Sequence, residues 1–410
     1  MKIKLQNIGI IEEADINIEG ITLIAGQNDS GKSTVGKVLY SIIKGFNQNI
    51  NLFQDEKNSR VIYRYQDILK ELKKNESIDI AEFQIKEISS GWLEKIEKTI
   101  QLESINEDSR KALSDSLRML KKYFYVDFNT IEQKKDEITN WLRSEIATLH
   151  NVFKTSETIS KIEIEDLEGN GTIEQWYKDR DFIFINLDNN LETYLKDVYF
   201  IESPSIVDES LQRFVGKDGA QLYSRNRQEE LAKSLSNPLT NAILDYSKIY
   251  KEISEIINGE ITIDLLQGVR YKKNKQDLNI KNTAVGIKSF GLIQLLLKNN
   301  RLNNRTLLII DEPEVHLHPT WQVKYAEILV KLSKDFDIPM LLTSHSPYFI
   351  EAIEAYSKKY NHEKSTNFYF SKKNEDGLSS RIIDVTNDIS PILSSISEAF
   401  YKIQDINDED

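Results

Sequence analysis

The fold is decided by Gly26-Gln27-Asn28-Asp29-Ser30-Gly31-Lys32-Ser33, which fits the pattern G-x-x-x-x-G-K-[ST]. The segment follows Ile21–Ala25, a short apolar run typical of a buried strand. From Lys32 to about Lys44, apolar residues recur at three- and four-residue steps, as they do in a helix. A strand, a glycine-containing loop and a helix in this order give the context that the pattern requires, so we predict a phosphate-binding loop.

Each residue type in the loop has a physical reason to be there. The glycines let the backbone fold tightly around phosphate, and successive N–H groups with the following helix N-terminus supply a positive field. Lys32 can reach the β- and γ-phosphates, and the Ser33 hydroxyl can ligate Mg²⁺. The sequence therefore predicts ATP and Mg²⁺ as cofactors, bound through Gly26, Asn28, Asp29, Ser30, Gly31, Lys32, Ser33 and Thr34.

A second apolar run, Leu307-Leu308-Ile309-Ile310, ends in Asp311-Glu312-Pro313. Adjacent carboxylates at a strand end repel each other, which is tolerable where a cation or a chemical task lies nearby. We expect Asp311 to ligate Mg²⁺ together with Ser33, and Glu312 to polarise the water that attacks the γ-phosphate.

Histidines cluster close to these carboxylates in the sequence. His345 follows the apolar run Met340–Thr343, so a parallel sheet would place it beside the Asp311 strand, where it can contact the γ-phosphate or the water. We predict a catalytic role for His345. The pair His316-x-His318 has no evident third metal ligand, and we interpret it as part of a loop that contacts a second subunit.

Composition narrows the class of protein. The chain has 410 residues with 53 Lys+Arg against 65 Asp+Glu, so any contact with nucleic acid must be a local patch. The absence of cysteine excludes disulfides, Cys-ligated zinc and a cysteine nucleophile. No long apolar run and no apolar signal segment are present, so we expect a cytoplasmic protein without a membrane contact.

The pattern of elements predicts an α/β fold, a mixed sheet with flanking helices and a large helical insertion. The insertion is expected because its segments Val61–Leu72, Ile85–Ile100, Ala112–Tyr123 and Ile131–Val152 combine helical periodicity with almost no Gly or Pro. Strands are expected at Ile162–Leu167 and Phe182–Asn186, with a turn at Glu168–Gly171 between them, and helix at Pro391–Ile403. The predicted divisions are 1–45 (N-terminal head with the loop), 46–158 (insertion), 159–225 (returning strands), 226–290 (helical lid) and 291–410 (C-terminal head).

These motifs resemble those of ABC-type ATPases of the SMC/RecF/OLD-like group. More narrowly, the chain resembles the stand-alone AAA-family ATPases of bacterial phage-defence systems, of the PtuA and AriA type. The resemblance rests on Gly26–Ser33, on Asp311-Glu312-Pro313-Glu314 with His316-Leu317-His318-Pro319, and on Thr343-Ser344-His345-Ser346-Pro347. It covers residues 1–45 and about 196–400, and it implies a P-loop ABC-type ATPase head.

The resemblance implies that nucleotide is held between two heads, with a signature loop of the second subunit touching the γ-phosphate. The corresponding segment here is Thr283–Ser289, in which Val285 stands where a hydroxyl is expected. Either Ser289 takes over that contact or the backbone and the helix dipole make it. Glu202, in Glu202-Ser203-Pro204-Ser205, stands where the group has a glutamine.

The function that these expectations favour is a slow ATPase that forms a homodimer, or a higher oligomer, on binding ATP. It would control a separate effector, such as a nuclease or toxin, in anti-phage defence. The alternatives are a RecF/SMC-like DNA-repair or DNA-clamp ATPase, a non-hydrolysing ATP-bound scaffold, and a transporter nucleotide-binding subunit. The transporter reading is disfavoured by Glu202, by Val285 and by the length of the insertion.

The chain itself is not expected to cut DNA. The short segment after His345 already contains a predicted hairpin and helix, which leaves no room for the metal-binding nuclease domain of OLD-type proteins. A contact with DNA stays open, because Arg270-Tyr271-Lys272-Lys273-Asn274-Lys275 could touch phosphate, although a solvated hairpin turn accounts for it better.

Overall fold

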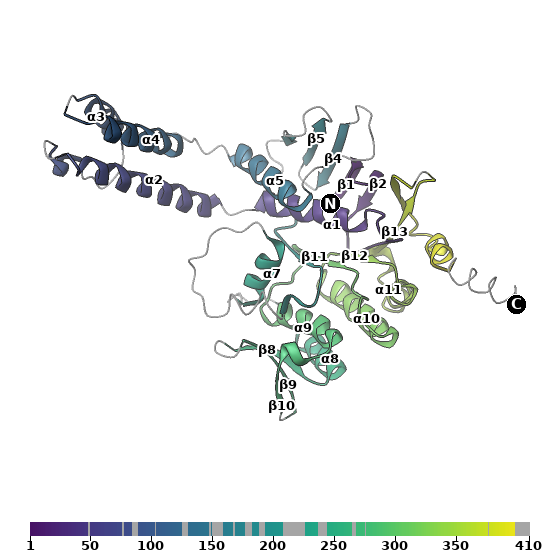
Figure 1. Ribbon diagram of the computed structural model, residues 1–410. Coiled ribbons are helices and arrows are strands. Elements are labelled where there is room, and N and C mark those ends of the chain that lie inside the picture. The colour runs from purple at the N-terminus through teal and green to yellow at the C-terminus, as the bar shows by residue number, and fades with distance from the viewer. Residues whose placement is uncertain are drawn as a thin grey trace, which may run out of the picture. The chain divides into compact units, whose positions relative to one another are not determined.

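The computed structural model describes most of the chain: residues 1–47, 50–75, 78–83, 89–102, 104–124, 130–146, 149, 159–166, 169–176, 183–187, 193–207, 226–236, 244–264, 268–274, 276–375 and 377–397. The chain divides into two compact units. The larger contains Met1–Asn47 and Lys134–Asp410, and the smaller is Gln48–Gln133. Figure 1 shows their elements, coloured by residue number.

An eleven-stranded mixed sheet is the frame of the larger unit in the described part of the chain, with the order β6-β5-β4-β1-β2-β14-β13-β3-β12-β11-β7. The strands are β1 (Lys2–Ile8), β2 (Ile11–Asn17), β3 (Ile21–Gly26), β4 (Ile159–Asp166), β5 (Gly169–Trp176), β6 (Phe184–Leu187), β7 (Asp197–Ile201), β11 (Thr306–Asp311), β12 (Met340–Ser344), β13 (Thr366–Lys373) and β14 (Ser380–Asp384). The α/β fold and the mixed sheet predicted from the sequence are confirmed.

The centre of the sheet is parallel. β13, β3, β12, β11 and β7 lie side by side in this order, and each adjacent pair is parallel. Their carboxyl ends therefore meet at one edge, where Asp311 is in register with Thr343, and Ser371 with Gly26. The parallel pairing of β11 and β12 confirms that His345 follows the strand beside Asp311.

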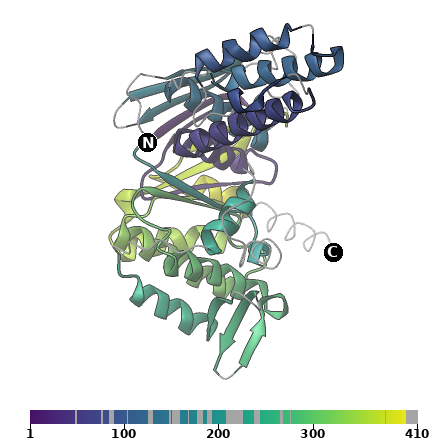
Figure 2. The ribbon, with the colours of Figure 1, turned by 90° about the vertical axis from the view of Figure 1, so that its left-hand side faces the viewer.

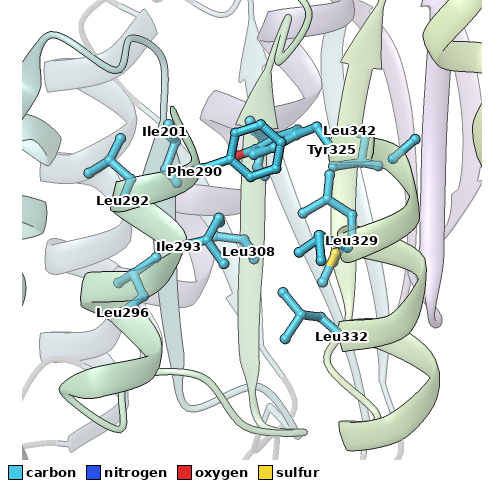
Figure 3. Close-up of a cluster of buried hydrophobic side chains, with 14 of the residues drawn as sticks. Ile201, Phe290, Leu292, Ile293, Leu296, Leu308, Tyr325, Leu329, Leu332 and Leu342 are labelled. Atoms are coloured by element: carbon cyan, nitrogen blue, oxygen red, sulfur yellow. The ribbon is translucent and has the colours of Figure 1, made fainter. Parts of the chain in front are cut away.

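Helices cover both faces of this parallel centre. Because successive side chains of a strand point to opposite faces, Ile309 of β11 joins the core with α1 (Lys32–Asn47), whereas Leu308 joins the core on the other face. There, Phe290 of α9 (Val285–Lys298) and Leu329 of α10 (Pro319–Phe336) pack with Leu308 (Figure 3). Each such buried side chain contributes about 1.5–3 kcal/mol, which fixes the strands that carry the site.

The larger unit contains further elements around this core. The helices are α7 (Arg227–Ser236), α8 (Ser247–Ile257), α11 (Pro347–Lys359) and the short η2 (Ile280–Asn282) and η3 (Glu363–Ser365). A separate three-stranded sheet lies beside α8 and α9 (Figure 2) and consists of β8 (Glu260–Asp264), β9 (Gly268–Lys273) and β10 (Gln276–Asn279).

The smaller unit is helical. It consists of α2 (Ile50–Leu72), η1 (Ile80–Phe83), α3 (Ser90–Ile100) and α4 (Glu107–Phe124), and α2 runs beside α4 (Figure 1). Its core includes Ile68, Leu93 and Leu120, all fully buried. The Lys/Glu-rich helices of the predicted insertion therefore form a core of their own.

The structure places the end of the insertion earlier than the predicted boundary at residue 158. The helix α5 (Thr130–Ile146) packs on α1 through Ile138 and through Trp141, whose ring meets that of Tyr40 edge-on at 5.5 Å. A side chain at Gly45 would meet Ile138 at 2.5 Å, so this contact is close. Residues 134–146 consequently belong to the larger unit.

The structure tests three local predictions: the turn at Glu168–Gly171, the basic cluster and the final helix. The turn predicted at Glu168–Gly171 is partly wrong, since β5 begins at Gly169 and continues the sheet; residues 167–168 lie outside the described residues. The basic cluster is part of the β9–β10 hairpin, whose turn residue Asn274 has φ 53°, as expected for a solvated turn, and Lys275 lies outside the described residues. The final helix is present at residues 390–397, and the rest of its predicted range lies outside them.

Candidate active site

The loop between β3 and α1 has the backbone that its glycines allow. Gly26 and Gly31 have φ values of 154° and 90°. A Cβ atom at Gly26 would lie 2.4 Å from the Ser371 carbonyl oxygen, and one at Gly31 would lie 2.6 Å from Ile11 Cγ1. Both positions therefore need glycine for conformation and for space. Asp29, with φ 56°, also lies in the left-handed region.

Lys32 spans this loop from the first turn of α1. Its buried ammonium donates to the carbonyl oxygens of Gly26, at 3.0 Å, and Gln27, at 2.7 Å. Burial lowers the pKa of Lys32 from its ordinary value, while the carboxylates of Glu312 and Asp311 oppose that shift. The cation is thus placed at the mouth of the loop, where an anionic ligand would further favour its charged form.

Ser30, in the middle of the loop, is held by hydrogen bonds from another part of the sheet. Its carbonyl accepts hydrogen bonds from the Ser371 and Ser380 hydroxyls, and its own hydroxyl is buried without a hydrogen-bond partner in the described part of the chain. Asn28 and Asp29 are exposed, and the Thr34 N–H donates to the Gly31 carbonyl at 3.1 Å. The structure therefore brings the predicted residues Gly26–Thr34 into one loop at the carboxyl edge of β3.

Asp311 meets the loop across the edge of the sheet. The Ser33 hydroxyl donates to Asp311 Oδ1 at 2.9 Å, and the Thr343 hydroxyl donates to the same oxygen. A serine hydroxyl and a carboxylate are hard oxygen donors of the kind that Mg²⁺ prefers. The geometry of Ser33 and Asp311 therefore fits the predicted metal site.

The backbone of Glu312, directly after β11, leaves the extended conformation of the strand. Its φ is 49°, and its N–H group donates to Thr343 at both the carbonyl oxygen, 3.2 Å, and the hydroxyl, 3.1 Å. The carboxylate is then 3.4 Å from His345 Nδ1, and both side chains are partly exposed. The two predicted catalytic residues are therefore neighbours.

Glu314 is the functional candidate that the sequence reasoning missed. Its side chain is 3% exposed, and its Oε1 accepts from the Ser344 hydroxyl (2.7 Å), the His345 N–H (2.8 Å) and the Ser346 N–H (3.2 Å). Burial raises the pKa of Glu314, and these hydrogen bonds oppose that shift. The carboxyl group holds the backbone of the His345 loop, and only the folding of β11 beside β12 reveals this.

A pocket opens beside the carboxylate pair. Its lining includes Glu202, Ser289, Glu312 and His316. The Ser289 side chain is buried, and its hydroxyl donates to the Val285 carbonyl at 3.3 Å. The structure thus brings Ser289 close to the Glu312 of its own chain, and its predicted nucleotide contact in a second subunit stays a prediction.

Glu202, which stands at the place expected for a glutamine, forms part of an ion-pair network. Arg227 Nη2 lies 2.9 Å from Glu202 Oε2, and the same guanidinium pairs with Glu145 of α5 and lies 4.6 Å from the Phe200 ring centroid. Burial raises the pKa of Glu145, and Arg227 opposes that shift. The network connects the pocket wall to α5.

The two other histidines of the cluster, His316 and His318, lie in the segment between β11 and α10. His318 caps α10, since its Nδ1 accepts the Thr320 N–H at 3.3 Å. His316, with φ 66°, lines the pocket near Glu312. In the described part of the chain no group of three or more His, Asp or Glu side chains is arranged to hold a metal ion.

A parallel-sheet core with a glycine loop, a buried lysine and an acidic strand end defines a P-loop nucleotide-binding ATPase. The chain belongs to the family described as AAA ATPase domain (AAA_15), which matches residues 1–350. Membership in this family shows that the protein is an ATPase of the AAA class. No helix among the described residues combines the length and the apolar character that a membrane crossing requires.

Known proteins similar to this chain include a curated relative from Vibrio cholerae serotype O1 biovar El Tor, named "Retron Vc95 probable ATPase". It is 22% identical over 385 residues, which cover 86% of this chain and 72% of the relative. Among solved structures, the SMC head domain from Thermotoga maritima matches with 11% identity and a TM-score of 0.41, covering 94% of this chain and 98% of that one. The SmcHead bound to the C-winged helix domain of ScpA matches with 10% identity and a TM-score of 0.44, covering 93% of this chain and 96% of that one.

Proposed function

We propose that the protein is a Mg²⁺-dependent ATP switch, in which Glu312 is the catalytic carboxylate. The observation that carries the proposal is the meeting of three groups at one sheet edge: the Ser33–Asp311 pair, Lys32, and Glu312 beside His345. Ser33 and Asp311 would hold Mg²⁺, which when bound offsets negative charge on the β- and γ-phosphates.

The chain's own residues supply the other parts of the mechanism. The loop N–H groups and the N-terminus of α1 bind the phosphates, and Lys32 adds a positive charge. Glu312 accepts a proton from the attacking water or orients it by a hydrogen bond. His345, 3.4 Å from Glu312, is in reach of the same water and can donate to the γ-phosphate.

We further propose that ATP joins two copies of the chain across their sites and that the dimer, or a higher oligomer, controls a separate effector such as a nuclease or toxin. The motifs shared with phage-defence ATPases and the similarity to a protein named as a retron's probable ATPase support a role in antiviral defence in the cytoplasm. The helical unit Gln48–Gln133 has a core of its own, as expected of a part that transmits the state of the site to a partner.

Two variants test the switch. Lys32→Ala removes the cation of the loop, so it is expected to abolish ATP binding and hydrolysis. Glu312→Gln keeps the loop intact, so it is expected to bind ATP normally, to lose hydrolysis and to accumulate as a dimer. Sedimentation of Glu312→Gln with and without ATP and Mg²⁺ decides the question. A variant that binds ATP with normal affinity yet stays monomeric would contradict ATP-driven dimerisation, and normal hydrolysis by it would contradict the role of Glu312.

A further inference from the structure

The hairpin of β13 and β14 is fixed to the phosphate-binding loop. The Ser371 hydroxyl, at 2.6 Å, and the Ser380 hydroxyl, at 2.7 Å, both donate to the carbonyl oxygen of Ser30, and all three residues are buried. The backbone of Ser371 also lies directly against Gly26. The backbone at the end of β13 is therefore fixed beside the loop.

One of these side chains is a cation that points toward the loop. Lys373 is two residues beyond Ser371, so the two side chains share a face of β13. Its ammonium lies 3.8 Å from Asp29 Oδ2. Burial is the main cause of the lowered pKa of Lys32, and the charge of Lys373 acts in the same direction. Lys373 is thus near the loop lysine, although it comes from a strand 341 residues further along the chain.

The partner of Lys373 in this structure is a weak one. The Asp29 side chain is 86% exposed, and an ion pair with a solvent-exposed carboxylate contributes little to stability. The phosphate chain of ATP carries several negative charges, and the N–H groups of the loop fix its position. A phosphate oxygen is therefore a stronger partner for the Lys373 ammonium than the solvent-exposed Asp29 carboxylate.

We propose that Lys373 is a nucleotide-binding residue that exchanges the Asp29 carboxylate for a phosphate oxygen when ATP binds. This inference rests on ATP binding by the loop. It assigns the β13–β14 hairpin a direct part in that binding and makes Asp29 a competitor of the nucleotide for the same cation.

The alternative is that the Lys373–Asp29 ion pair only stabilises the loop, and the two possibilities predict different nucleotide affinities for the variants. If the ion pair only fixes the loop, removing either partner should weaken nucleotide binding equally. If Lys373 binds phosphate, Lys373→Gln should weaken binding. Asp29→Asn keeps the backbone N–H that the loop offers to phosphate and removes only the carboxylate that competes for Lys373, so it should strengthen binding. Asn is a suitable replacement for Asp29 because it tolerates the left-handed backbone, here with φ 56°.

The experiment is a calorimetric titration of the full-length protein with a non-hydrolysable ATP analogue and with ADP, each with Mg²⁺. Lys373→Gln is expected to bind the analogue about tenfold more weakly, a loss of about 1.4 kcal/mol. The loss for ADP is expected to be smaller, because ADP lacks one charged phosphate. Lys373→Arg keeps the charge and is expected to restore most of the affinity.

Lys364→Gln is the matched control, because it removes the same charge from an exposed position of η3, at the end of β13 opposite to the loop, and should leave both affinities unchanged. The thermal unfolding midpoint without nucleotide shows that each variant is folded. Normal affinity of Lys373→Gln, or equal weakening by Lys373→Gln and Asp29→Asn, would overturn the inference. Failure of the unaltered protein to bind either nucleotide would instead overturn the proposed function.

Discussion

Replacing Glu314 by Gln should lower the rate of ATP hydrolysis in a protein that still folds. The Glu314 carboxylate is buried and accepts three hydrogen bonds at one oxygen, from Ser344, His345 and Ser346. A hydrogen bond to a charged group contributes about 1.5–3 kcal/mol, and one between neutral groups about 0.5–1.5 kcal/mol. An amide oxygen in the same place should therefore hold the His345 loop less firmly by about 1 kcal/mol per bond, or about 3 kcal/mol in total.

The rate of hydrolysis should show this loss. If the whole difference appears in the transition state, kcat falls by about a hundredfold, since each 1.4 kcal/mol is a factor of ten. The affinity for ATP should change little, because Glu314 makes no hydrogen bond to the described loop residues Gly26–Thr34 and holds Ser344, His345 and Ser346 instead. Steady-state ATPase assays that resolve kcat and KM, together with nucleotide titration, measure the two effects separately.

The free energy of unfolding should respond to Glu314→Gln in a way that depends on pH. Burial raises the pKa of Glu314 in the folded protein, so the folded state binds this proton more tightly than the unfolded state does. The favourable contribution is fully present below the unfolded pKa and is lost as pH rises through the raised folded pKa. Glu314→Gln carries no such proton, so relative to the unaltered protein its stability should improve as pH increases across that range, measured by urea unfolding at several pH values.

Glu327→Gln is the matched control for both measurements. Glu327 is a carboxylate of α10 that pairs with Lys331 and Tyr360, and its substitution should leave kcat unchanged. An unaltered kcat in folded Glu314→Gln would refute the idea that this carboxyl group positions His345. An equal loss of rate in both variants would show that the effect is not specific to the site.

Three further predictions follow from the same structure. Arg227→Ala should destabilise the larger unit by about 3 kcal/mol, because it removes the guanidinium that pairs with the buried Glu145. Urea unfolding measures this, and an unchanged midpoint would show that the pair contributes nothing. Gly31→Ala should lower nucleotide affinity at least tenfold, since φ 90° and the Cβ contact of 2.6 Å force the loop to move; titration with the non-hydrolysable analogue tests it, and unchanged affinity would contradict the packing argument. Deleting residues 48–133 and joining the ends by a Gly/Ser linker should preserve ATP binding and remove the biological output. A short linker suffices, because Gly45 and Ile138, which flank the deleted segment, lie close together in the larger unit. An unfolded product would mean that the larger unit needs the deleted helices.

The local part of the site could be predicted from the sequence because its information is local. Gly26–Ser33 carries the loop conformation in its glycines, and the apolar run before Asp311 predicts a buried strand that ends in carboxylates. The neighbouring position of β12 followed from the parallel arrangement that such runs adopt. These inferences needed no knowledge of which distant segments meet.

The parts that could not be predicted depend on pairings between distant segments. The short period-two patterns of β13 and β14 predict a hairpin, but nothing in them indicates that β13 pairs with β3 while β14 pairs with β2. β5 begins with Gly169-Asn170-Gly171, residues typical of a turn, and the pairing with β4 and β6 overrides that local preference. Helical periodicity likewise cannot tell that α5 packs on α1 rather than on the other helices of the insertion.

Glu314 shows the same limit at the level of a single side chain. In the sequence it is the fourth residue of Asp311-Glu312-Pro313-Glu314, and an acidic residue after a strand end is ordinarily solvated. Burial changes its role, because a carboxyl group removed from water must find donors, and the nearest donors are the hydroxyl and N–H groups of Ser344–Ser346. The turn after β11 and the turn after β12 are therefore held together by one carboxyl group. A change in the contacts of Glu312 or His345 on binding ATP would consequently be felt in both turns, including the segment Val315–His318, whose His316 lines the pocket.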